Sequence, residues 1–292
     1  MPEGRIVKSL SGYYYVKSGG QLWQCRARGL FKKKQYSPLV GDWVHFDETE
    51  NGEGYIQSIE PRKTELVRPP VANADQAVIV HSVREPDLQP LLIDKFLVHA
   101  ERAGMKPFIV FTKIDLGAPK GELEELIAVY EGIGYPVVLT SVVKNCGLEQ
   151  LGQMLDGHIS VLAGQSGTGK SSLLNALIPE VRLKTGDISR KLGRGRHTTR
   201  HVEMLELSTG GWVVDTPGFS RLSFDGWEAE ELGTYFPEMA PLADQCKFRG
   251  CLHFREPQCA VKGAVDTQTV HALRYEHYLQ FLTEIQEQRR YE

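Results

Sequence analysis

The stretch GQSGTGKSS, residues 164–172, has the residue types and the spacing of a phosphate-binding loop. It matches G-x-x-x-x-G-K-[ST] in full and lies between an expected strand and an expected helix. Glycines in such a loop let backbone N–H groups face phosphate oxygens beside the helix N-terminus. We expect Lys170 to reach the β- and γ-phosphates and Ser171 to ligate Mg²⁺. The remaining residues expected to surround the phosphates are Gly164, Gln165, Ser166, Gly167, Thr168, Gly169 and Ser172.

A second motif, Asp215-Thr216-Pro217-Gly218, ends an apolar strand downstream of this loop. A carboxylate at that point can hold the Mg²⁺ shell through water, and the Gly218 N–H can meet the γ-phosphate. The tetrapeptide alone is common in turns, and its place at a strand end after a phosphate loop makes the functional interpretation the stronger one.

A third motif, Thr112-Lys113-Ile114-Asp115, has the pattern that reads guanine in GTPases. Asp115 can accept from N1–H and the exocyclic amine of guanine together, whereas adenine lacks this donor pair. The Lys113 stem can lie across the base, and Thr112 occupies a position where Asn is commoner. The next strand ends at Thr140-Ser141, where backbone N–H groups can meet guanine O6.

The order of these motifs along the chain is unusual. The base reader and base loop precede the phosphate loop, whereas an ordinary GTPase has the phosphate loop first. Cutting such a domain after its DTPG strand and joining the old ends gives this order without changing the sheet or the pocket. The sequence therefore predicts a circularly permuted GTPase domain.

Three cysteines and a histidine near the C-terminus have the spacing of a metal site, Cys246-x4-Cys251-x-His253-x5-Cys259. Three thiolates and one imidazole form a closed tetrahedral zinc set with no position open for catalysis. A small region of this kind gains its core from the metal. We expect one structural zinc ion, and we expect its loss to disorder the tail.

The catalytic group is harder to identify from the sequence. Phe219 follows Gly218, where Ras-like proteins carry a water-orienting Gln, so intrinsic hydrolysis should be slow. The basic segment 193–200 is the candidate switch, in which Thr198 or Thr199 can complete the Mg²⁺ shell and His197 can position or deprotonate water. The expected catalytic residues are His197, Lys170 and Thr199.

The elements that must position these residues fall into three regions. Residues 1–66 read as short strands with glycine turns, which predicts a small barrel of the oligonucleotide-binding type. Residues 71–225 alternate buried strands with helices, which predicts a parallel sheet covered on both faces and ending in a hairpin at Gly210-Gly211. Residues 226–292 are expected to be helical, with a last helix over about 267–290.

Aromatic and basic residues alternate in the expected barrel. Aromatic rings can stack on bases while cations neutralise phosphates, which favours nucleic-acid binding. The alternative is that the rings fill the barrel core, and for Trp23 and Trp43 we expect the core. On the last helix, His271 and His277 are expected at the surface. The other aromatic residues of this group are Tyr13, Tyr14, Tyr15 and Phe31.

Composition sets further limits on the function. The 292 residues carry a net charge of −3, yet residues 1–40 hold eight Lys or Arg against one Glu, and residues 182–200 hold seven against one Asp. Two basic patches in a mildly acidic protein indicate an anionic polymer as partner or an exposed loop. No run of eighteen apolar residues and no apolar signal core is present. We expect a cytoplasmic, monomeric protein.

Taken together, the barrel, the permuted motifs and the Cys/His tail resemble the RsgA (YjeQ/YloQ) family of small ribosomal subunit biogenesis GTPases. The resemblance covers nearly the whole chain. It implies an α/β GTPase domain between an RNA-binding barrel and a helical zinc domain, and GTP hydrolysis stimulated by the small ribosomal subunit during its late maturation. It implies binding to the subunit's rRNA, a structural Zn²⁺, Mg²⁺ with GTP, and a catalytic role for His197.

Other classes remain open at this point. An ATP-dependent enzyme would bind ADP rather than GDP, and a non-enzymatic RNA-binding switch would release no phosphate when small subunits are added. A GTPase that acts on DNA or tRNA would share the basic patches, because these do not identify their polymer.

Overall fold

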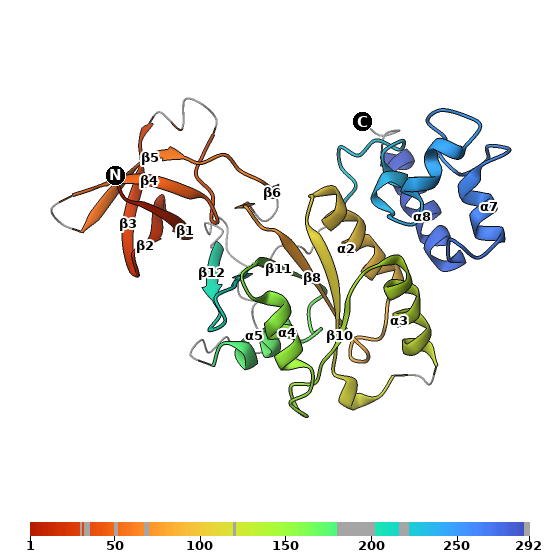
Figure 1. Ribbon diagram of the computed structural model, residues 1–292, viewed down its shortest axis with the longest axis horizontal. Coiled ribbons are helices and arrows are strands. Elements are labelled where there is room, and N and C mark those ends of the chain that lie inside the picture. The colour runs from red at the N-terminus through yellow and green to blue at the C-terminus, as the bar shows by residue number, and fades with distance from the viewer. Residues whose placement is uncertain are drawn as a thin grey trace.

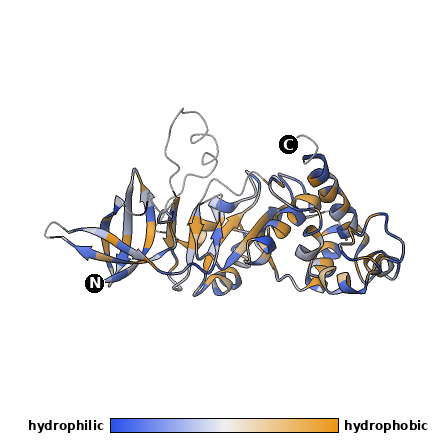
Figure 2. Ribbon diagram, turned by 90° about the horizontal axis from the view of Figure 1, so that it is seen from above, coloured by the Kyte–Doolittle hydropathy of each residue, from blue (hydrophilic) through white to orange (hydrophobic). Residues whose placement is uncertain are grey.

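The computed structural model describes residues 1–29, 31, 36–49, 52–66, 70–118, 121–179, 202–215 and 222–288, with Asp215 as backbone alone. These residues form a β-barrel, a central sheet with helices on both faces, and a helical C-terminal region (Figure 1). The three parts lie in a row, and the most hydrophobic strands lie in the central one (Figure 2).

The N-terminal barrel consists of five short strands that alternate inward apolar and outward polar residues. The strands are β1 (Glu3–Leu10), β2 (Tyr13–Ser18), β3 (Gln21–Ala27), β4 (Trp43–Glu48) and β5 (Glu53–Ile59). They pair in the order β1-β2-β3-β5-β4, and β4 pairs again with β1 to close the barrel. Ile6, Val16 and Phe46 are fully buried in its core. The predicted small barrel is confirmed.

The prediction of two core tryptophans was half wrong. Trp23 is partly buried and its ring centroid lies 5.7 Å from that of Phe46. Trp43 is 42% exposed, and the Arg5 guanidinium lies 4.9 Å from its ring centroid. Trp43 opens strand β4, and its side chain points outward because Val44 takes the inward position of the alternating strand.

A short connection fixes the barrel to the central domain. It contains β6 (Glu65–Leu66) and β7 (Val71–Ala72), which pair with each other. Arg62 donates two hydrogen bonds of 2.8 Å to the buried Asp42 carboxylate of the barrel. Charge-assisted, bidentate hydrogen bonds of this kind are stronger than hydrogen bonds between neutral groups.

The central sheet carries helices on both faces. Its strands are β8 (Gln76–Ser82), β9 (Lys106–Thr112), β10 (Val137–Leu139), β11 (Ile159–Ala163), β12 (Val202–Glu206) and β13 (Trp212–Asp215). Its helices are α2 (Pro90–Arg102), α3 (Glu122–Ile133), α4 (Leu148–Leu155) and α5 (Lys170–Leu177). One face packs against α2 and α3 and the other against α4 and α5. The predicted strand–helix alternation is confirmed.

The strand order explains how the permuted domain keeps its shape. The order is β10-β9-β8-β11-β13-β12, in which β8 to β11 and β13 run parallel and β12 is antiparallel to β13. The expected hairpin turns at Gly210 and Gly211. The strand before the phosphate loop, β11, is therefore central although it is the fourth strand of this domain along the chain.

The barrel and the central domain share one sheet. Strand β1 pairs antiparallel with β12 through Lys8↔Glu203 and Ser9↔Val202, which makes the sheet eleven-stranded. Lys8 Nζ lies 3.2 Å from Glu203 Oε1, and Lys17 pairs with Glu206 across the same junction.

The C-terminal region packs against α2 of the central domain. It contains η2 (Leu232–Tyr235), η3 (Ala240–Gln245), α7 (Ala260–Asp266) and α8 (Ala272–Gln288). The buried Asp94 of α2 accepts from Tyr130 at 2.8 Å and lies 2.5 Å from His277 Nδ1 and 2.8 Å from Arg274. The expectation that His277 lies at the surface was wrong, because it faces this carboxylate and is 5% exposed. No described helix is long and apolar enough to cross a membrane.

Candidate functional site

The carboxyl ends of five strands meet at one edge of the central sheet. Strands β8, β9, β10, β11 and β13 are parallel, so the loops that follow them lie at the same edge. Ligands of open α/β sheets bind in the crevice outside this edge. The base reader, the base loop, the phosphate loop and Asp215 all follow or end these strands.

The phosphate loop has a backbone that glycine alone fits at its first position. Gly164 has φ +145°, and a Cβ there would lie 2.2 Å from the Val80 carbonyl oxygen of β8. Gly167 and Gly169 also have positive φ, at +86° and +94°. The loop turns into α5 at Lys170, so the helix N-terminus faces the crevice.

Lys170 extends back over this loop. Its Nζ lies 2.7 Å from the Gly164 carbonyl oxygen and 2.5 Å from that of Gln165. Ser171 and Ser172 are partly buried in the first turn of α5. These positions are compatible with the expected contacts of Lys170 with the phosphates and of Ser171 with Mg²⁺.

The base-reading motif is tied to the phosphate loop. Thr112 is buried at the end of β9, and its Oγ1 donates to the Thr168 carbonyl oxygen at 2.6 Å. Lys113 has a left-handed backbone with φ 57°, and its ammonium donates to the Glu85 carbonyl of the β8–α2 loop. Thr112 therefore provides a tether at the position where Asn is commoner.

Asp115 and the base loop are joined by a side-chain hydrogen bond. Ile114 and Asp115 belong to the short helix η1 (Ile114–Leu116), and Ser141 Oγ lies 2.5 Å from Asp115 Oδ1. The sequence placed Ser141 in the site through its backbone alone, and no local pattern pointed to its hydroxyl. The pairing fixes one carboxylate oxygen, so that the carboxylate has a defined orientation toward a base.

Part of the expected site lies outside the described residues. This holds for His197, Thr198, Thr199 and Gly218, and for the side chain of Asp215. The backbone of Asp215 ends β13 opposite Glu203 of β12, at the same edge as the phosphate loop.

The predicted Cys/His cluster forms in the C-terminal region. One ligand atom from each of Cys246, Cys251, His253 and Cys259 lies within 4.8 Å of the others. His253 Nδ1 is 3.3 Å from Cys259 Sγ and 3.6 Å from Cys246 Sγ. Bonds of about 2.3 Å put the ligand atoms of a tetrahedral metal about 3.8 Å apart. The four residues therefore fit a tetrahedral metal site.

Hydrogen bonds from outside the cluster hold its loop in place. The hydroxyls of Tyr275 and Tyr278 on α8 donate to the carbonyls of His253 and Leu252 at 2.6 and 2.7 Å. Burial raises the pKa of Cys251 to about 12, and the neighbouring Cys259 adds to the shift. The raised pKa favours the protonated thiol. A bound metal cation would favour the thiolate instead, because thiolates are the metal-binding form.

Cations lie over aromatic rings at two surfaces. On the barrel, the Arg26 guanidinium is 4.6 Å from the Tyr13 ring centroid, and the Arg5 guanidinium is 4.9 Å from that of Trp43. In the metal loop, Phe248 and Phe254 are 44% and 39% exposed and have Lys247 and Arg255 over their rings. This second surface was not predicted from the sequence, although adjacent aromatic and basic residues in the metal loop form a usable pattern.

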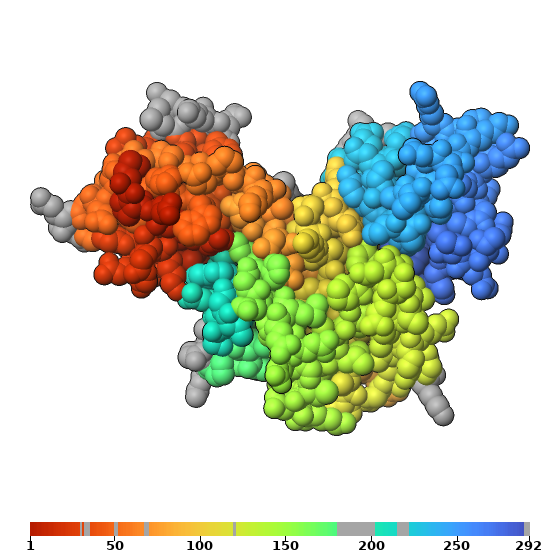
Figure 3. All heavy atoms as spheres, viewed as in Figure 1, coloured from red at the N-terminus to blue at the C-terminus, as the bar shows by residue number. Residues whose placement is uncertain are grey.

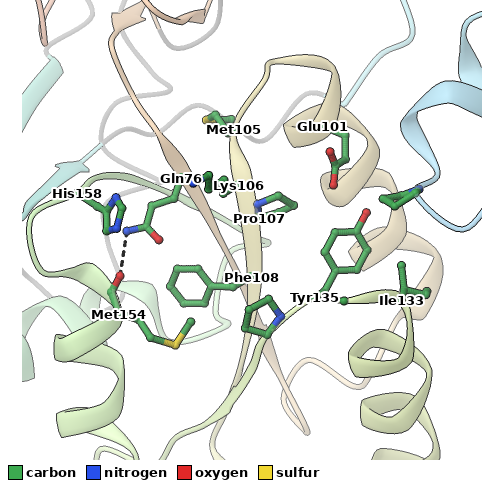
Figure 4. Close-up of a pocket in the computed structure, with 13 residues that line it drawn as sticks. Gln76, Glu101, Met105, Lys106, Pro107, Phe108, Ile133, Tyr135, Met154 and His158 are labelled. Carbon is green, nitrogen blue, oxygen red and sulfur yellow. Dashed lines mark hydrogen bonds between the residues drawn. The ribbon is translucent and has the colours of Figure 1, made fainter. Parts of the chain in front are cut away.

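A cavity of about 550 Å³ lies at the opposite edge of the sheet (Figure 4). It is lined by the amino ends of β8 and β9, including Gln76 and Phe108, and by Tyr135 and Met154. The motif residues lie at the other edge, so this cavity is separate from the candidate nucleotide site.

Comparisons with known proteins agree with this architecture. The family model described as RsgA GTPase matches residues 59–225, and the RsgA N-terminal domain matches residues 3–56. The chain is 54% identical over 292 residues to the small ribosomal subunit biogenesis GTPase RsgA of Shouchella clausii and 54% identical over 291 residues to that of Geobacillus kaustophilus, covering 99% of both chains in each case.

Two solved structures are similar over nearly the full length. The crystal structure of YloQ, a circularly permuted GTPase, has a TM-score of 0.84 at 42% identity and covers 99% of this chain and 96% of its own. YjeQ from Thermotoga maritima has a TM-score of 0.86 at 38% identity, with 97% and 98% covered. The two family models, the full-length relatives at 54% identity and the two similar structures together show that the chain belongs to the RsgA family of circularly permuted GTPases.

Proposed function

We propose that this GTPase binds the small ribosomal subunit and hydrolyses GTP during the late maturation of that subunit. The observation that carries the proposal is the meeting of Asp115, Thr112 and the phosphate loop at one sheet edge, joined by the Thr112–Thr168 hydrogen bond. The names of the relatives supply the subunit as partner.

In the proposed site each residue has a defined task. Asp115 accepts from guanine N1–H and the exocyclic amine. The Ser141 hydroxyl, which donates to Asp115 Oδ1, orients the carboxylate. Lys170 neutralises charge that moves onto the leaving phosphate oxygens. Ser171 and Thr199 would hold Mg²⁺, which supplies further positive charge to the phosphates. His197 positions the attacking water or takes its proton.

The same reasoning extends to the metal and the RNA. We propose Zn²⁺ at the Cys246, Cys251, His253 and Cys259 site, because three thiolates and one imidazole favour it and leave no open position. We propose that the barrel and the metal loop contact rRNA through the cation–aromatic pairs on their surfaces. In Figure 3 the barrel and the C-terminal region rise on either side of a hollow, so the two surfaces can contact separate RNA segments.

We further propose that the protein is a cytoplasmic monomer with three functional domains, 1–66, 71–225 and 226–292. In this division the barrel contacts RNA, the central domain binds and hydrolyses GTP, and the metal stabilises the tail. Its boundaries agree in outline with the family matches to residues 3–56 and 59–225.

The test is GTP hydrolysis by the purified protein with and without small ribosomal subunits. We expect slow phosphate release from the protein alone, because Phe219 cannot orient water, and a rise of at least about tenfold with subunits. ATP in place of GTP should give no release, because adenine leaves the Asp115 carboxylate unpaired. Equal rates with and without subunits would contradict the proposal.

A further inference from the structure

The phosphate loop contains a side chain that the motif does not require. Thr168 is fully buried, and its Oγ1 donates to the Gln165 carbonyl oxygen at 3.0 Å within the loop. The same hydroxyl lies against Gly164, where an added Cβ would be 3.3 Å from it. The position allows any residue in the pattern G-x-x-x-x-G-K-[ST], so the hydroxyl is a feature of this chain.

This hydrogen bond fixes one peptide plane of the loop. The carbonyl and the N–H of a trans peptide point in opposite directions, so holding the Gln165 carbonyl toward Thr168 turns the Ser166 N–H away from it. The Gln165 carbonyl also accepts from Lys170 Nζ at 2.5 Å. The Thr168 hydroxyl thereby orients an acceptor that positions the phosphate-binding ammonium.

Thr168 is held from its other side as well. Its carbonyl accepts from Thr112 Oγ1 at 2.6 Å, and Thr112 opens the base-reading motif. The residue thus connects the base reader, through its carbonyl, to the start of the phosphate loop, through its hydroxyl. Both hydrogen bonds join groups of the protein itself, so they can shape the loop without any contact from a nucleotide.

We propose that Thr168 is a positioning residue whose hydroxyl holds the phosphate loop in its binding conformation before GTP or GDP arrives. The inference rests on the proposed nucleotide function of this loop. A loop that is competent for only a fraction of the time binds more slowly in proportion to that fraction. Removal of the hydroxyl should therefore lower the association rate and leave dissociation of the bound nucleotide nearly unchanged.

The experiment is stopped-flow binding of fluorescently labelled GDP to the full-length wild type, Thr168→Val and Thr168→Ser. Thr168→Val keeps the shape without the hydroxyl, and we expect association about fivefold slower, the scale of one neutral hydrogen bond. Dissociation should change less than about twofold. Thr168→Ser keeps the hydroxyl and should associate at a rate within about twofold of the wild type.

A matched control removes a similar hydrogen bond elsewhere. Thr64 Oγ1 donates to the Ala74 carbonyl in the connection to the barrel, so Thr64→Val should leave association unchanged. Circular dichroism during heating shows whether each variant is folded, and Thr168→Ala replaces Thr168→Val if the latter is not.

The outcomes are distinct. Unchanged association in Thr168→Val, equally slow association in Thr168→Ser, or faster dissociation with normal association would each overturn the role of Thr168. A wild type that binds no GDP would instead contradict the proposed nucleotide site.

Discussion

Asp115 depends on two hydroxyls for its place in the site. Ser141 donates to its carboxylate at 2.5 Å, and Thr112, three residues earlier, fastens the start of the motif to the phosphate loop at 2.6 Å. A carboxylate held in this way can discriminate between bases, because its orientation is set before the base arrives. In the proposed site, base choice and phosphate binding are therefore connected through side chains of adjacent loops.

Asp115→Asn should exchange the base preference. The amide matches a carbonyl at the purine 2-position and no longer accepts from both guanine donors, so GTP affinity should fall at least about tenfold and xanthosine triphosphate affinity should rise. Competition binding with both nucleotides measures this. Asp156→Asn, an exposed residue after α4 at the other edge of the sheet, is the control. Unchanged GTP affinity in Asp115→Asn would remove the base-reading role.

His197→Ala should reduce subunit-stimulated turnover by about a hundredfold, the usual scale for a positioned acid–base group. GDP affinity should stay the same, because the residue is expected to act on water and not on the nucleotide. Single-turnover hydrolysis and equilibrium GDP binding separate the two effects. Wild-type turnover in the variant would show that His197 has no catalytic role.

Among the elements, α2 carries most of the contact between the nucleotide domain and the C-terminal region. Besides Asp94, Lys95 Nζ lies 2.7 Å from Glu284 of α8, and Arg102 donates to the Gly226 carbonyl at 2.8 Å. His99 stacks on Phe224 at 5.2 Å between ring centroids. The helix starts at Pro90, directly after the loop whose Glu85 carbonyl binds Lys113. Helix α2 therefore begins next to the loop that contacts the base reader, and its length packs against the C-terminal region.

Acid should weaken this contact through His99. Burial, together with the positive charges of Lys95 and Arg102, lowers its pKa to about 4. The unfolded chain binds the proton near pH 6.5 and the folded chain only near pH 4, so stability is complete above about 6.5 and falls as the pH drops toward 4. The loss should be on the order of 3 kcal/mol.

Urea unfolding between pH 7 and pH 4.5 tests this contribution. His99→Phe keeps the ring contacts with Phe224 and should show a flatter pH dependence than the wild type. His158→Gln alters a histidine that is 45% exposed and should keep the wild-type slope. Parallel curves for His99→Phe and the wild type would show that His99 does not carry the effect.

The sequence predicted that loss of the metal disorders the whole tail, whereas the contacts of α8 with α2 lead us to expect that the metal loop is affected more than α8. Cys251→Ser should abolish zinc measured by elemental analysis, and hydrogen exchange should accelerate over residues 246–259. Helix α8 should stay protected, because Arg274 and His277 bind the buried Asp94 of α2 independently of the metal. Cys146→Ser changes an exposed cysteine outside the cluster and should keep the zinc. Full exchange of α8 in Cys251→Ser would instead show that the metal holds the whole tail.

The sequence allowed some of these elements to be predicted and not others. The phosphate loop, the TKID motif and the metal ligands are local patterns, and their spacing reflects backbone geometry within a few residues. The pairing of β1 with β12 and the burial of His277 are long-range features. Lys8 and Glu203 are 195 residues apart, and His277 and Asp94 are 183 apart, so no periodicity in either segment indicates its partner. The exposure of Trp43 likewise depends on which face of its strand turns toward the barrel core, and this is set by pairing with distant strands.

For the whole molecule, nucleotide state should set affinity for the subunit. The segments before β12 and after β13 contain the expected switches, β12 is paired with the barrel, and the chain after β13 enters the C-terminal region. A γ-phosphate that orders these segments can therefore bias how both outer parts meet RNA. If GTP tightens binding of the subunit, the subunit must tighten binding of GTP by the same factor.

Subunit affinity measured with GDP and with a non-hydrolysable GTP analogue tests this prediction. We expect at least about fivefold tighter binding with the analogue, the lower end of usual coupling. Nucleotide affinity measured with and without subunits should shift by the same factor. Equal affinities in both states would exclude a nucleotide-controlled docking cycle, whatever the hydrolysis rate.

The shared sheet also bears on the tendency of the chain to self-associate. An unpaired strand edge is a template on which a second chain can add, and a closed barrel has no such edge. Here β1 covers part of the edge of β12, while Lys8 and Lys17 place charges beside it. The N-terminal barrel therefore shields part of this strand. A fragment that begins after the barrel would expose β12, Val202–Glu206, and gain a tendency to self-associate, so the barrel also protects its neighbour against aggregation.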